Sequence, residues 1–129
     1  MMKRNREIAT ALLLGAVSAS AHDPLQTDGD KYKAILDNAC VRVLEYRDRP
    51  GDRTRQHTHS AFALYALAPF KRTLTLPDGR VLTREFKAGD VLWSPAQTHI
   101  GENVGSTPTH VVIFELKPGA ATADACAPH

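Results

Sequence analysis

Between Tyr32 and Leu116 the sequence consists of short runs rich in β-branched and aromatic residues, separated by turn-forming residues. No helical periodicity is sustained anywhere in this stretch. Short strands at such close spacing predict an all-β domain, either a small antiparallel barrel or a sandwich. The expected strands cover residues 32–36, 41–46, a segment around 57–59, 61–68, 70–76, 80–86, 91–93, 98–104 and 109–116.

One hairpin can be predicted down to its register. Residues 77–79 read Pro-Asp-Gly between two β-rich runs. A three-residue loop with glycine in the left-handed conformation would pair Leu74 with Leu82 and Phe70 with Phe86. A two-residue Asp-Gly loop would pair threonine with leucine instead, so the first register is the better prediction.

The run 61–68 is almost entirely apolar, which predicts a strand buried on both faces or nearly so. The same charge-poor run, extended to Phe70, is a candidate interface for a homodimer. Aromatic residues on barrel strands usually belong to the core, although two of them, Tyr65 and Trp93, have the mouth of a pocket as an alternative. The expected core aromatics are Phe62, Tyr65, Trp93 and Phe114.

The N-terminal segment resembles an export signal. Three basic residues among the first six precede a short apolar run at 8–17 and the small residues Ala-Ser-Ala at 19–21. This pattern predicts a secretory signal peptide over 1–21 and a periplasmic or secreted protein, with an amphipathic helix as the alternative. The apolar run is too short to span a membrane. The remaining chain is divided into an N-terminal linker at 22–31, a single domain at 32–118 and a C-terminal tail at 119–129.

Removal of the signal would leave 13 of the 16 basic and 13 of the 14 acidic residues. No basic tract remains, so the sequence offers no support for binding to nucleic acid or to an anionic membrane. Export would also place Cys40 and Cys126 in an oxidising compartment, where thiols tend to pair. A bridge would fix the tail to the first strands; in the alternative, the tail is disordered and no bridge forms.

Three histidines form the main chemical pattern. His57 and His59 are two residues apart, so in a strand they share one face and can chelate one ion. His99 follows a proline farther along the chain. Neutral imidazoles are common metal ligands, and three of them with an open position are typical of a catalytic metal site.

The spacing of these residues resembles the two sequence motifs of the cupin superfamily. The residues that carry the resemblance are Gly51, His57, His59, Gly89, Pro95, His99 and Asn103. The chain departs from the first motif by having Ala63 and Leu64 where a glutamate is expected. It departs from the second motif in the segment 95–99, which is one residue shorter than usual and lacks a glycine.

The resemblance implies an antiparallel jelly-roll (cupin) barrel that holds one divalent metal ion, Fe, Zn, Mn, Cu or Ni, through His57, His59 and His99. Asn103 is expected to serve the turn rather than the metal. No residue is assigned a catalytic role.

Gln56 and Thr98 are candidate partners of the ring nitrogens. Alternation places Glu102 on the opposite face, although it would complete the metal site if the chain bends; the face of His110 is left open. His22 can chelate copper if it becomes the N-terminus, but its position is better explained by chance. Arg53, Arg55 and Arg84 are expected to be solvated, and an arginine just before His57 is an alternative carboxylate clamp.

Three functional hypotheses follow. The first is a metal-dependent enzyme acting on a small molecule, dioxygenase-like because thiol dioxygenases among the cupins also use three histidines. A metal-bound hydroxide would permit an isomerase or a hydrolase as the alternative. The second is a non-catalytic periplasmic protein that binds a small molecule or a metal. The third is a barrel without metal that works through its surface or as a dimer.

Overall fold

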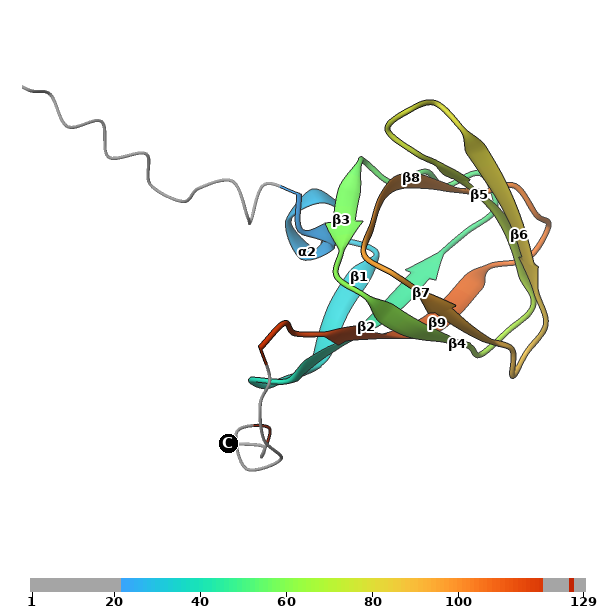
Figure 1. Ribbon diagram of the computed structural model, residues 1–129. Helices are drawn as coiled ribbons and strands as arrows, with labels where there is room; N and C mark the ends of the chain where they lie inside the picture. Colours follow the sequence, from blue (N-terminus) through green and yellow to red (C-terminus); the bar gives the residue numbers. More distant parts are fainter. Residues whose placement is uncertain (1–21, 120–125, 127–129) are drawn as a thin grey trace, which may run out of the picture.

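The computed structural model describes residues 22–119 and residue 126. Their strands form two antiparallel sheets that lie face to face (Figure 1). The five-stranded sheet has the order β1 (Tyr32–Asp37), β2 (Val41–Asp48), β9 (Thr109–Leu116), β4 (Phe62–Ala66) and β7 (Val91–Ser94). The four-stranded sheet has the order β3 (His57–His59), β8 (Gln97–Asn103), β5 (Phe70–Thr75) and β6 (Val81–Phe86). The predicted all-β jelly-roll fold is therefore confirmed.

The two sheets are not closed into one hydrogen-bonded barrel. Within the described part of the chain, every strand pairing lies inside one sheet or the other. The predicted hairpin register is confirmed, because Leu74 pairs with Leu82 and Phe70 with Phe86. Gly79 has φ +89°, the left-handed conformation that this loop requires.

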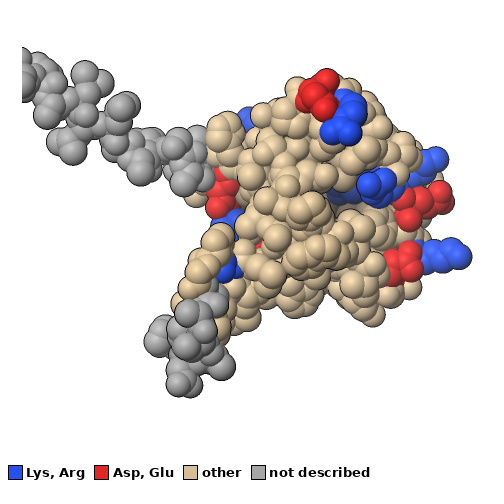
Figure 2. All heavy atoms as spheres, in the orientation of Figure 1, with Lys and Arg blue, Asp and Glu red and all other residues tan. Residues whose placement is uncertain are grey.

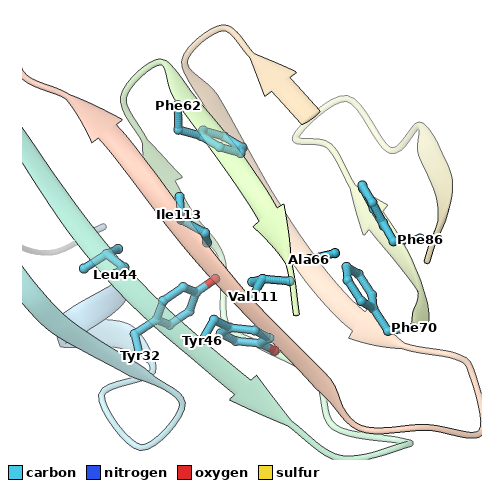
Figure 3. Packing of buried hydrophobic residues seen from close by; sticks show 9 residues of the cluster. All are labelled: Tyr32, Leu44, Tyr46, Phe62, Ala66, Phe70, Phe86, Val111 and Ile113. Carbon is cyan, nitrogen blue, oxygen red and sulfur yellow. The ribbon is translucent and has the colours of Figure 1, made fainter. Parts of the chain in front are cut away.

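The hydrophobic core fills the space between the sheets (Figure 3). The rings of Phe70 and Phe86 stack with centroids 4.7 Å apart, and those of Tyr32 and Tyr46 lie 4.5 Å apart. Burial of each large side chain contributes about 2 kcal/mol. The buried cluster consists of Tyr32, Leu44, Tyr46, Phe62, Ala66, Phe70, Phe86, Val111 and Ile113.

The prediction that residues 61–68 are buried on both faces is wrong. Phe62 is in the core as expected, but Tyr65, Trp93 and Phe114 are 43%, 58% and 41% exposed. Tyr65 and Phe114 lie on the outer face of the five-stranded sheet, and no other layer of the described residues covers that face. Trp93, on the edge strand β7, is exposed but also lines the cavity, in agreement with the pocket-mouth alternative. An apolar run shows that a strand is hydrophobic, but it does not show how many layers pack against it.

The segment 22–31, predicted as a linker, contains the short helix α2 (Pro24–Thr27). The Asp23 carboxylate caps this helix by accepting from the Leu25 amide at 2.8 Å, and it pairs with Arg42 of β2 at 2.6 Å. The Thr58 amide donates to the His22 carbonyl at 2.8 Å, which ties the segment to β3. The predicted signal peptide lies outside the described residues, as does most of the predicted tail. No described helix is long and apolar enough to cross a membrane.

Cys40 and Cys126 form a disulfide, with Cα atoms 5.0 Å apart. Asn38 supports it by donating from its side-chain amide to the Cys126 carbonyl at 2.8 Å. Of the two alternatives left open by the sequence, the bridged one is observed.

On the face drawn in Figure 2, basic and acidic side chains lie beside one another rather than in a patch of one sign, in line with the even charge balance.

Candidate metal centre

The three histidines come from two neighbouring strands. In the ladder of β3 and β8, His57 pairs directly with His99, and His59 pairs with Gln97. The side chains of His57, His59 and His99 point to the interior and are 0%, 1% and 5% exposed. One ring nitrogen of each lies within 4.8 Å of the others. The predicted convergence of these residues is thus observed, and the cluster is a candidate site for one metal ion.

The loop before β3 fixes this strand against β8. Thr54 holds Gly101 of β8 twice: its amide donates to the Gly101 carbonyl, and its hydroxyl accepts from the Gly101 amide, both at 2.8 Å. Gly51, with φ +88°, forms the preceding turn and donates its amide to the Asn103 carbonyl at 2.9 Å. The Asn103 side chain donates to Asp48 and to the Thr107 carbonyl, both at 2.9 Å. Asn103 therefore serves the turns, as the resemblance implies.

The Nδ1 atom of each histidine is held by an oxygen acceptor. His57 Nδ1 lies 2.9 Å from the Arg55 carbonyl, His59 Nδ1 2.7 Å from Glu115 Oε2, and His99 Nδ1 2.8 Å from Gln97 Oε1. Because these oxygens accept and do not donate, each Nδ1 carries the proton. Each Nε2 therefore carries no proton and has a lone pair. This is the tautomer that a metal ligand requires.

The prediction that Gln56 or Thr98 holds the ring nitrogens is wrong. The Thr98 hydroxyl lies 2.7 Å from the Thr58 hydroxyl, because alternation turns both side chains away from the histidines. Gln56 is exposed just before β3. Two side chains accept from the Nδ1 atoms of the cluster. They are Gln97, which shares the inner face of β8 with His99, and Glu115 of β9.

Glu115 is a functional residue that sequence reasoning missed. Its side chain points inward and is 4% exposed; its second carboxylate oxygen accepts from Arg42 Nε at 2.7 Å. Burial by itself would raise the pKa of Glu115, but the hydrogen bonds from His59 and Arg42 outweigh burial and lower it. The carboxylate is therefore ionised. A sequence signal did exist, since Glu115 continues the inward alternation of Val111 and Ile113, where a charge is costly unless it is paired.

His57 and His99 are neutral in this environment. Burial, followed by the proximity of His59, lowers the pKa of His57 to about 4. Burial and the neighbouring His59 and His57 lower the pKa of His99 well below its ordinary value. Protonation, which competes with metal binding, is therefore disfavoured at neutral pH.

Two side chains complete the surroundings of the cluster. The Tyr32 hydroxyl lies 3.1 Å from His57 Nε2, and burial raises the pKa of Tyr32 well above its ordinary value, so the phenol remains a donor. Leu64, at one of the two positions where the motif expects glutamate, lines the interior cavity beside Phe62. The anionic ligand of the motif is thus replaced by hydrocarbon.

The remaining candidates lie away from the cluster. Glu102 pairs with Thr73 on the opposite face of β8, as alternation predicts. His110 binds Glu45 through Nε2 at 3.0 Å and does not join the other histidines. His22, Arg53 and Arg55 are exposed. The prediction that Arg84 is solvated is wrong, because its side chain is half-buried and lines the cavity.

The cavity has a volume of about 190 Å³ and lies between the two sheets beside His59 and His99. Its walls are mostly aromatic and aliphatic. The apolar lining residues are Phe62, Leu64, Phe70, Leu74, Phe86, Leu92, Trp93, Pro95, Val111 and Ile113. An apolar chamber with a few polar groups at one side is typical of a small-molecule site.

Comparison with solved structures identifies the family. A cupin domain protein from Bordetella pertussis is 27% identical to this chain, with a TM-score of 0.61. The match covers 67% of this chain and 91% of the Bordetella chain. The chain belongs to the cupin superfamily. No protein-family model matches the sequence, and no curated protein matches it.

Two further structures share the cupin fold. An uncharacterised protein from Klebsiella pneumoniae with a double-stranded β-helix domain is 21% identical, with a TM-score of 0.54 over 81% of this chain and 90% of its own. Bacillus subtilis oxalate decarboxylase, solved in a study of its Mn(II) centres, is 22% identical, with a TM-score of 0.52 over 70% of this chain and 27% of its own. At these identities the likeness concerns the fold.

Proposed function

We propose that this cupin is a metal-dependent enzyme that binds one divalent ion through Nε2 of His57, His59 and His99 and acts on a small molecule in the adjoining cavity. The observation that carries the proposal is the set of three anchored Nδ1 atoms. Each is held at 2.7 to 2.9 Å by an oxygen acceptor, so all three Nε2 atoms carry lone pairs within one buried cluster. The lone pair of His57 accepts from the Tyr32 hydroxyl, which a bound ion would displace.

The donor set fits such an ion. Three neutral imidazoles suit Fe, Zn, Mn, Cu or Ni, and the Mn(II) centres of the oxalate decarboxylase agree with a divalent metal in a cupin of this fold. A bound ion would supply Lewis-acid chemistry or, if it is redox-active, dioxygenase-like oxygen chemistry. With no carboxylate among the three converging residues, the ion would keep its full charge and prefer an anionic partner.

The protein's own residues would prepare this site in two ways. Glu115 holds the His59 ring in one tautomer and places a negative charge behind it. The apolar walls of the cavity exclude water, which strengthens every charge interaction inside.

A non-catalytic carrier is the second candidate function. The residues that line the cavity include no Asp or Glu, so the described residues offer no carboxylate base to a molecule inside it. Export through residues 1–21 would make this carrier a periplasmic or secreted binding protein. This carrier would hold a small molecule or a metal, and turnover separates it from the enzyme.

The test is metal content of the untagged protein after incubation with Fe(II), Zn, Mn, Cu or Ni, compared with His57→Ala and His99→Ala. His110→Ala is the matched control, because His110 lies outside the cluster. We expect about one equivalent in the wild type and the control and none in the two site variants. Turnover of small-molecule substrates then distinguishes enzyme from carrier, measured as oxygen uptake for a redox-active ion and as hydrolysis or isomerisation for zinc. The absence of stoichiometric metal in the wild type after all five incubations would refute the proposal.

A further inference from the structure

Two arginines stand on one wall of the cavity. Arg72 of β5 and Arg84 of β6 are direct cross-strand neighbours, and both line the cavity. Like charges in opposed positions of a ladder are unfavourable. Among residues 22–119, no acidic side chain lines the same cavity.

The partners of Arg72 are weak for a buried cation. Its side chain is 10% exposed, and one guanidinium nitrogen lies 3.7 Å from Asp48 Oδ2. Another lies 3.5 Å from the Tyr46 hydroxyl, while the guanidinium carbon lies 4.9 Å from the centre of the Tyr46 ring.

Asp48 already serves other donors. The Tyr46 hydroxyl donates to it at 2.5 Å, the Asn103 side chain at 2.9 Å and the Thr109 amide at 3.2 Å. The guanidinium of Arg72 therefore has capacity for a further anion.

Gly101 makes room for this guanidinium. A Cβ atom at Gly101 would lie 3.1 Å from Arg72 Cζ and overlap one of its terminal nitrogens. Glycine inside a strand weakens it, and often marks a close approach of another group. Gly101 shares the inner face of β8 with His99, two residues away, so the guanidinium lies next to the candidate metal centre along the strand.

We propose that the cavity binds a small organic carboxylate, whose charged group pairs with Arg72 while Arg84 supplies a second cation on the same wall. A planar guanidinium matches a carboxylate with two parallel hydrogen bonds, and in a buried site this pairing is stronger than in water. The apolar walls accommodate a hydrocarbon body. The volume of about 190 Å³ equals roughly six waters of liquid, which limits the ligand to a compact molecule such as an aromatic or short-chain acid.

This inference names the substrate class of the proposed function and in that sense rests on it. Binding of the anion, however, depends on Arg72 and does not require the ion. The metal-free protein therefore tests the carboxylate site separately from the metal site.

The experiment is calorimetric titration of metal-free and metal-loaded protein with benzoate, pyruvate and acetate. Benzamide, which has the shape of benzoate without its charge, is the control ligand. Trp93, the single tryptophan of the chain, lines the cavity, so its fluorescence reports whether the ligand enters there. We expect benzoate to bind the metal-free protein about tenfold or more tightly than benzamide and to change the Trp93 emission.

The variants are Arg72→Met, Arg84→Met and Gly101→Ala. The matched control is Arg80→Met, because Arg80 is an exposed hairpin residue that pairs with Asp78 outside the cavity. Arg72→Met should weaken benzoate binding about tenfold or more, with little effect on benzamide. Arg84→Met and Gly101→Ala should weaken benzoate binding by smaller factors, and they carry the test if Arg72→Met fails to fold by thermal unfolding.

Three results would overturn the inference. They are saturable binding by none of the three carboxylates, equal affinity for benzoate and benzamide, and wild-type benzoate affinity in the folded arginine variants. If the carboxylate result holds while the protein takes up no metal, the inference stands and the proposed metal-dependent function fails.

Discussion

The most informative single substitution is Glu115→Gln. It keeps the shape of the side chain and an oxygen that can accept from His59 Nδ1, but it removes the negative charge behind the ring. In the wild type that hydrogen bond is 2.7 Å long and joins two side chains that are 1% and 4% exposed. Water cannot replace the lost charge at such a position. The substitution therefore isolates the electrostatic support that Glu115 gives to the candidate metal ligand.

The expected loss can be set from this geometry. Partners that hold a ligating histidine typically contribute a factor of about 10 to 100 in metal affinity, or about 1.4 to 2.7 kcal/mol. Arg42 retains Asp23 as a partner at 2.6 Å, so the guanidinium is not left without a counter-ion. We therefore expect Glu115→Gln to fold and to bind zinc about 10- to 100-fold more weakly than the wild type.

Competition with a chromophoric chelator at neutral pH measures this affinity. Glu45→Gln is the matched control, because Glu45 also accepts from a histidine, His110, at 3.0 Å but lies outside the cluster. Its zinc affinity should stay within about twofold of the wild type. Equal zinc affinities for wild type and Glu115→Gln would refute the argument that Glu115 supports His59 as a ligand. Equal losses in both variants would show a general charge effect instead.

Three further predictions concern stability and the other side of the cluster. Replacement of Cys40 and Cys126 by serine should lower the free energy of unfolding by about 4 to 5 kcal/mol in the chain-entropy model, because the bridge spans 86 residues. A loss below about 1 kcal/mol in urea unfolding would contradict this prediction. Metal-free protein should lose stability as the pH falls from about 6.5 toward 4, because the pKa of His57 is lowered to about 4 and only the unfolded chain takes up its proton in that window. Urea unfolding at several pH values checks this, and a His57→Gln variant with the same pH slope would count against it. Tyr32→Phe removes a hydroxyl that donates to the lone pair of His57 Nε2, which a metal would need. Zinc binding should therefore tighten about fivefold. Weaker zinc binding would mean that the hydroxyl assists the ion.

Local rules were sufficient to predict the strands. Gly79 adopts the left-handed conformation expected of it, and the length of its loop fixed the hairpin register. The exposure of Tyr65 was not predictable in the same way, because burial depends on what packs against a face of the sheet. No local pattern reports that the five-stranded sheet is covered on one side only.

The candidate site was predictable where its geometry is local or follows the motif spacing. His57 and His59 share a face by alternation, and the motif placed His99 opposite them. Glu115 is 56 residues from His59, so their hydrogen bond depends on how the two sheets pack. Arg72 was missed for a related reason, although a charge at an inward position between Phe70 and Leu74 is a signal that alternation alone provides.

The missing glutamate changes where the negative charge lies rather than removing it. Asp28 Oδ2 lies 3.5 Å from His57 Nδ1, and Glu115 lies behind His59, so both carboxylates are on the far side of the rings from the cavity. On the cavity side, Leu64 leaves the wall uncharged, and Arg72 and Arg84 make it positive. A glutamate at position 64 would line this cavity and oppose an incoming anion. With the acids behind the histidines, a cation at the cluster is stabilised from one side while the other side attracts an anionic ligand.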